Sequence, residues 1–174
     1  RTYTTNQFHT LPLLEWLVAD LIPKAGVGIV YGASGSGKST LCLDLARSVC
    51  TGESWAGHAV DQGNVLYCCL EGAPGMRHRV IAAERHYGIN FGDRLHWLFD
   101  DFSLASENDI NDLAATAIAG SAALIIIDTL SASIRGVLDE SSNPHMSRML
   151  QLAYRLTESL LKNPRNPHEH WLLG

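Results

Sequence analysis

Short apolar runs alternate along the chain with segments in which apolar residues recur every three or four positions. The runs have the length of strands and are flanked by Gly, Asn or Asp, as is typical of strands buried in a sheet. They cover residues 27–31, 65–70, 95–99 and 124–127. The first intervening segment places Leu41, Leu45 and Val49 on one side of a helix. This alternation predicts an α/β fold with a mostly parallel sheet between helices.

Capping residues set the expected helix limits. A helix that follows a glycine-rich loop should end near residues 50–52, and a second should run from Pro74 to about Tyr87, with Gly88 as its stop. Ser106 is the expected cap of a helix over 107–119 that Gly120 closes. A long helix should begin at 141–144, with an apolar face made of Met146, Met149, Leu150, Ala153 and Leu156.

The two ends of the chain carry weaker patterns. Residues 1–10 read as a loose lead-in, and 13–22 as a short helix that ends at Pro23. Residues 162–174 have the composition of a loop or of a truncated end. A first residue other than Met leads us to expect a trimmed fragment. We expect one domain over 1–174, with its core over about 13–161.

Composition narrows the class of protein. The chain has 174 residues, 46% hydrophobic and 18% charged, which is typical of a globular protein and argues against disorder. A formal net charge of -5 gives no general attraction to nucleic acid. No apolar run reaches the length of a membrane span. We therefore expect a cytoplasmic protein without a membrane partner, and read its cysteines as small buried residues.

Residues 32–39 match the phosphate-loop pattern G-x-x-x-x-G-K-[ST] between a predicted strand and a predicted helix. Glycines allow successive N–H groups to point at phosphate oxygens, and the start of the helix adds its positive end. Lys38 should neutralise the terminal phosphates, and Ser39 should ligate Mg²⁺. The residues expected to bind nucleotide are Gly32, Ala33, Ser34, Gly35, Ser36, Gly37, Lys38, Ser39 and Thr40.

Two acids follow predicted strands. Asp128 ends the apolar run 124–127, where it can hold Mg²⁺ through water. Thr129 comes next, which disfavours ATPases with a catalytic Glu beside this Asp. Glu71 follows the run 65–70, at the edge where a parallel sheet opens onto its ligand. A carboxylate there can accept a proton from an attacking water or can instead cap the next helix.

Together these residues resemble the RecA-like ATPases, and within them the AAA-domain ATPases of plasmids and phages related to hexameric replicative helicases. The resemblance covers about residues 13–160. Besides the phosphate loop, it rests on a Trp before an Ile-Pro turn, Glu-Gly followed by arginines, and Asp-Thr-Leu before an acidic stretch. These are Trp16, Ile22, Pro23, Glu71, Gly72, Arg77, Arg79, Asp128, Thr129, Leu130 and 139–143.

The resemblance implies an ATPase with ATP, ADP and Mg²⁺ as ligands and Glu71 as general base. It also implies a homo-oligomeric ring such as a hexamer, an arginine finger from the neighbouring subunit, and single-stranded DNA as a partner. A further strand is expected after the long helix, in the sheet beside strand 27–31. In this sequence only residues 171–173 there are apolar.

Other classes stay open. A small-molecule kinase should carry an arginine-rich lid, which is not evident here. A GTPase needs an Asn-Lys-x-Asp segment, which the sequence lacks. A nucleotide-dependent assembly or regulatory module with slow turnover is a third possibility. Arg77, Arg79 and Arg85 read as a solvated helix face, with a trans-acting arginine finger or a polynucleotide contact as the alternative. Arg135 is a candidate phosphate or subunit contact.

Overall fold

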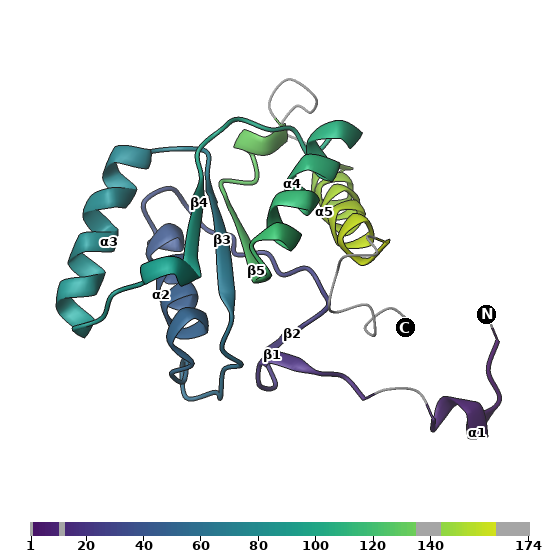
Figure 1. Ribbon diagram of the computed structural model, residues 1–174. Coiled ribbons are helices and arrows are strands. Elements are labelled where there is room, and N and C mark those ends of the chain that lie inside the picture. Colours follow the sequence, from purple (N-terminus) through teal and green to yellow (C-terminus); the bar gives the residue numbers. More distant parts are fainter. Residues whose placement is uncertain (1, 11–12, 135–143, 163–174) are drawn as a thin grey trace.

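The structure is a computed structural model that describes residues 2–10, 13–134 and 144–162. Within these residues, a three-stranded parallel sheet lies between two pairs of helices (Figure 1). Its strands, in the spatial order β4–β3–β5, are β3 (Asn64–Cys69), β4 (Leu95–Leu98) and β5 (Ala122–Asp128). All three were expected from the apolar runs.

Two helices cover each face of the sheet (Figure 1). One face packs against α2 (Lys38–Thr51) and α3 (Ala73–Tyr87), and the other against α4 (Glu107–Ala119) and α5 (Pro144–Lys162). The result is the three-layer α/β sandwich of a P-loop NTPase. The predicted caps are confirmed, because Gly88 ends α3 in the left-handed region and the Ser106 side chain accepts the N–H of Asp109.

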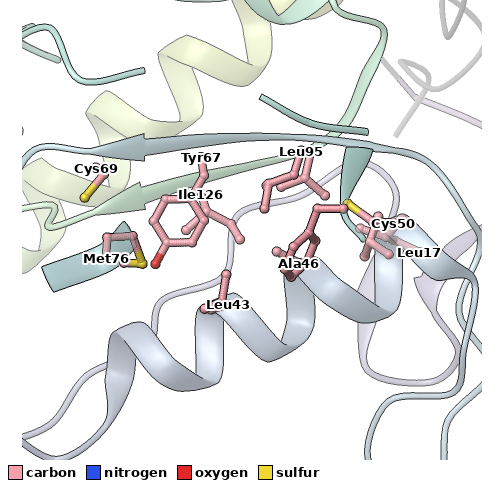
Figure 2. Packing of buried hydrophobic residues seen from close by; sticks show 12 residues of the cluster. Leu17, Leu43, Ala46, Cys50, Tyr67, Cys69, Met76, Leu95 and Ile126 are labelled. Carbon is pink, nitrogen blue, oxygen red and sulfur yellow. The ribbon is translucent and has the colours of Figure 1, made fainter. Parts of the chain in front are cut away.

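The central position of β3 in the sheet explains why its residues 65–69 are all apolar. Val65, Tyr67 and Cys69 pack in the core toward α2 and α3 (Figure 2), while Leu66 and Cys68 pack toward α4 and α5. Side chains alternate between the faces of a strand, so a strand covered on both faces must be apolar at every position. β3 therefore links the two core clusters and fixes both helical layers relative to the sheet.

The short helix predicted over 13–22 is wrong. This segment forms an antiparallel pair, β1 (Trp16–Val18) and β2 (Ile22–Pro23), with Asp20 in a left-handed turn. Val18 also bridges Val60, and Ala19 N–H donates to Ala59 O at 2.8 Å. These contacts with a distant segment decided the conformation. A short helix, α1 (Thr5–Phe8), lies in the lead-in instead, capped by Thr4.

The buried strand predicted over 27–31 is also wrong for the part of the chain described here. These residues pair with no described strand, and Val30 and Tyr31 are 49% and 86% exposed. A β-branched run becomes a strand only where a neighbour offers its backbone groups. The resemblance placed that neighbour after the long helix, where residues 163–174 lie outside the described residues.

The long helix was correctly expected, and its described side chains support the apolar face. Leu156, a member of that face, is buried against the layer that contains α4, and so is Leu152, which the predicted face did not include. Ala153 is half-buried. The side chains of Met146, Met149 and Leu150 lie outside the described ones, so that part of the predicted face stays a prediction.

A matched pair of glycine variants tests how tightly β5 packs beside β3. A Cβ at Gly63 would lie 2.5 Å from the Cβ of Ala123, whereas a Cβ at Gly75 in α3 would meet nothing within 4 Å. Gly63→Ala should lower the free energy of unfolding by about 1–3 kcal/mol through overpacking. Gly75→Ala should raise it by up to about 1 kcal/mol, because alanine favours the helix. Urea denaturation measures both, and equal effects of the two substitutions would contradict this packing.

Candidate phosphate-binding site at the sheet edge

The glycine-rich loop runs directly into α2. Gly35 and Gly37 adopt left-handed conformations, and Gly37 is the N-cap of the helix. Side chains rarely adopt this region, so the loop needs glycine at both positions. The first N–H groups of α2 have no acceptor within the helix and carry its positive end. The loop therefore has the backbone conformation that the predicted anion-binding turn requires.

Lys38 lies across this loop. Its ammonium group donates to the carbonyl oxygens of Gly32 and Ala33, at 2.9 Å each. The loop is also closed by Ser36 N–H, which donates to Ala33 O at 3.2 Å. The positively charged ammonium group of Lys38 therefore lies against the backbone of the loop. Ser39 is half-buried and Thr40 exposed in the next positions of α2.

Glu71 and Asp128 lie at the same edge of the sheet. β3 and β5 are parallel neighbours with Cys69 opposite Asp128, and Leu70 N–H donates to Asp128 O at 2.8 Å. Glu71 follows Leu70 directly and is exposed, while Asp128 is half-buried. The peptide bond between Asp128 and Thr129 is cis. The pairing register therefore brings together two acids that are far apart in the sequence.

Asp128 faces the layer that contains α2. Ile126, two residues earlier on β5, packs in the core cluster formed with α2, so Asp128 projects to the same side. Burial, with the charge of Asp128 as the second cause, raises the pKa of the Cys42 thiol to about 11. Cys42 lies one helical turn after Lys38. The structure thus places this carboxylate beside the first turns of the helix that follows the phosphate loop.

The comparison with known families agrees with this geometry. A family model described as an AAA domain matches residues 3–160, which is most of the chain. The chain belongs to this AAA-domain family. This family is a P-loop family found in helicase-like proteins, and its members are nucleotide-binding ATPase modules. No curated protein and no solved structure matches the chain.

Two features are absent from the described part of this AAA-domain protein. None of its helices there is long and apolar enough to cross a membrane. No group of three or more His, Cys, Asp or Glu side chains gathers there as a metal site. Arg135, the candidate phosphate or subunit contact, lies outside the described residues.

The cysteines and the basic face of α3 fit their structural interpretation. All four cysteines are free, and three of them are buried. Burial raises the pKa of the Cys68 thiol to about 12, so it stays protonated at neutral pH. Arg77, Arg79 and Arg85 are exposed on α3, as expected of a solvated face.

Sequence reasoning missed Tyr67. Its side chain is fully buried in β3, and its hydroxyl donates to Asp128 Oδ2 at 2.9 Å. Burial and the Asp128 charge raise the pKa of Tyr67, which keeps this hydroxyl a donor. This hydrogen bond from the core orients the Asp128 carboxylate. A Tyr in the apolar run 65–70, which has no other aromatic residue, was the available signal, because a buried phenol needs a hydrogen-bond partner.

Removing this hydroxyl should destabilise the protein. Tyr67→Phe keeps the ring in the core but leaves Asp128 without this donor, so the free energy of unfolding should fall by about 1–2 kcal/mol. The matched control is Tyr154→Phe on α5, where the side chain is exposed and the change should be negligible. Urea denaturation of both variants measures the difference. A Tyr67→Phe variant as stable as the wild type would show that the hydrogen bond contributes nothing.

Proposed function

We propose that this AAA-domain protein binds Mg-ATP at residues 32–40 and hydrolyses it, with Glu71 as the general base. The observation that carries the proposal is the convergence at one sheet edge. The acids Glu71 and Asp128 end adjacent parallel strands, and Asp128 faces the helix that the phosphate loop begins. Ligand sites of open parallel sheets lie at this edge, outside the carboxyl ends of the strands.

The loop residues account for phosphate binding. Backbone N–H groups at the start of α2 and in the glycine turns donate to phosphate oxygens. Lys38, which now donates to Gly32 O and Ala33 O, exchanges these carbonyls for the terminal phosphates. A charged phosphate is a stronger acceptor than a neutral carbonyl. The exchange therefore favours the nucleotide-bound loop.

Ser39 and Asp128 fit a magnesium ion. Hydroxyl, carboxylate, water and phosphate oxygens are the ligands that Mg²⁺ takes at nucleotide sites. Asp128 is held by the Tyr67 hydroxyl and faces α2, where Ser39 lies in the first turn. When bound, the ion neutralises charge that develops on the transferred phosphate. The chain itself contributes one hydroxyl and one oriented carboxylate.

In this proposal Glu71 acts on the attacking water. Its carboxylate accepts a proton from the water that attacks the γ-phosphorus, while the bond from that phosphorus to the β–γ bridging oxygen breaks. The products are ADP and phosphate, and the proton on Glu71 returns to solvent. Because Glu71 is exposed at the strand end, water reaches it without a conformational change.

We further propose that the protein works as a homo-oligomeric ring on single-stranded DNA. Support comes from its family, which is found in helicase-like proteins, and from the sequence resemblance to hexameric replicative helicases. A ring would let a neighbouring subunit supply an arginine finger to the site. Residues 13–161 would form the core of each subunit.

The first test separates binding from turnover. Lys38→Ala should abolish ATP binding measured by calorimetry. Glu71→Gln should keep binding but lower the rate of phosphate release by about 100-fold or more, because it removes the base. Glu107→Gln is the matched control, since Glu107 is an exposed acid in the first turn of α4. Full activity of Glu71→Gln would reject the assigned base.

The second test concerns the polynucleotide. ATP hydrolysis by the wild type should rise several-fold on addition of single-stranded DNA, and this stimulation should be absent in Glu71→Gln. Sedimentation with Mg-ATP should show an oligomer. Slow hydrolysis that DNA does not change would favour the assembly or regulatory module, and phosphate transfer to a metabolite would favour the kinase.

A further inference from the structure

An open hollow of about 610 Å³ lies beside the phosphate loop and extends past it. Gly37 and Lys38 line one end, while Leu41, Asp44 and Tyr87 line the other. The hollow thus continues from the loop onto the outer face of α2 and the last turn of α3. The proposed function assigns the loop to phosphates and leaves this outer part without a role. A smaller hollow of about 270 Å³ contains no phosphate-loop residue.

The outer part lies within reach of a bound nucleotide. Leu41 and Asp44 are three positions apart and share one face of α2. With a rise of 1.5 Å per residue, Asp44 lies about 9 Å along the helix from Lys38. The terminal phosphates belong at Lys38, so the ribose and base must extend away from it. The face formed by Leu41 and Asp44 runs in that direction, inside the same hollow.

The chemistry of this face suits a flat, mostly apolar group. Leu41 and Tyr87 are 45% and 46% exposed, and Tyr31, at the wall of the hollow, is 86% exposed. Nucleobases bind by stacking on aromatic and aliphatic side chains, whose surface is then removed from water. Ligand sites typically combine such apolar walls with a few polar groups that fix orientation. Asp44 supplies a polar group here.

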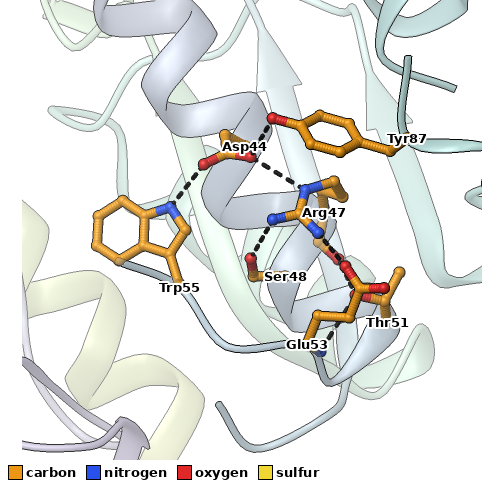
Figure 3. A network of polar contacts seen from close by, with 7 residues as sticks. All are labelled: Asp44, Arg47, Ser48, Thr51, Glu53, Trp55 and Tyr87. Atoms are coloured by element: carbon orange, nitrogen blue, oxygen red, sulfur yellow. Dashed lines mark hydrogen bonds and ion pairs between the residues drawn. The ribbon is translucent and has the colours of Figure 1, made fainter. Parts of the chain in front are cut away.

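A network of contacts holds Tyr87 and Asp44 in place (Figure 3). The Tyr87 hydroxyl donates to Asp44 Oδ1 at 3.2 Å, and the Arg47 guanidinium lies 4.3 Å from the centre of the Tyr87 ring. Arg47, only 7% exposed, donates to Asp44 at 3.0 Å and pairs with Glu53. Trp55 Nε1 donates to Asp44 Oδ2 at 3.0 Å.

This network prepares the face for a ligand in two ways. It fixes the Tyr87 ring before binding, which lowers the entropy lost when a base stacks on it. The Arg47 charge also offsets that of Asp44, so the acid does not strongly repel nearby phosphates. Asp44 keeps lone pairs for an additional donor, because a carboxylate offers about four acceptor sites and, among the described residues, three side-chain donors contact it.

We propose that this outer part of the hollow is the subsite for the base of ATP. The base packs against Leu41 and the Tyr87 ring, and Asp44 accepts a hydrogen bond from an N–H or O–H group of the nucleoside. The proposal rests on the proposed function, since the base reaches this face only when the phosphates occupy the loop. It assigns specificity to residues outside the phosphate-loop motif.

The experiment compares ATP with inorganic tripolyphosphate, which has the phosphates but no base. Calorimetry in Mg²⁺ should show that the wild type binds ATP more tightly. Tyr87→Ala should weaken ATP about tenfold, as expected for a lost stacking contact, without changing tripolyphosphate affinity. Tyr87→Phe keeps the ring and its contact with Arg47 but loses the hydrogen bond to Asp44, so it should keep most of the ATP affinity. Leu41→Ala should weaken ATP about fivefold. The control is Ile81→Ala, an exposed aliphatic residue on α3 outside the hollow.

The outcomes distinguish the base subsite from the proposed phosphate site at residues 32–40. Equal wild-type affinity for ATP and tripolyphosphate would overturn the base subsite and leave the phosphate site standing. No binding of either ligand would overturn both. If Tyr87→Ala and Leu41→Ala weaken the two ligands alike, the subsite is also wrong. Should Tyr87→Ala fail to fold, as judged by circular dichroism, Leu41→Ala against Ile81→Ala decides the question.

Discussion

The parallel pairing of β3 with β5 is the interaction on which the site depends. One register sets Cys69 opposite Asp128 and Tyr67 opposite Ile126. It therefore decides that the acid after β3 and the acid at the end of β5 share an edge. It also brings the buried Tyr67 hydroxyl to Asp128. A shift of one residue would turn Asp128 toward α4 and α5 and away from the phosphate loop.

The helix α2 joins the phosphate loop to the rest of the molecule through two different faces. Its inner face, with Leu43, Ala46 and Cys50, packs against the sheet (Figure 2). Its outer face contributes Asp44 and Arg47 to the polar network with the last turn of α3 (Figure 3). Because the loop ends where α2 begins, packing of the inner face fixes the direction in which the loop presents its N–H groups. On the outer face, Leu41 and Asp44 line the hollow beside the loop.

The two errors in the predicted fold have a common cause. Residues 13–22 are apolar enough for a short helix, yet Val18 pairs with Val60 and the segment turns at Asp20. Residues 27–31 have the composition of a buried strand, yet they pair with none of the described strands. In both cases the local pattern is compatible with more than one conformation. The partner across the chain decides which one forms, and a short window contains no information about that partner.

The sequence by itself determined the features that depend on neighbours along the chain. The phosphate loop, the caps at Gly88 and Ser106, and the strand ends at Glu71 and Asp128 are local, because backbone conformation and helix termination follow from a few adjacent residues. Only the tertiary structure decided which strands are adjacent, that Tyr67 supports Asp128, and that Tyr87 lies beside Asp44. These contacts join residues 61 and 43 positions apart. They arise from packing of whole layers, in which many side chains contribute at once, so no pattern of single residues specifies them.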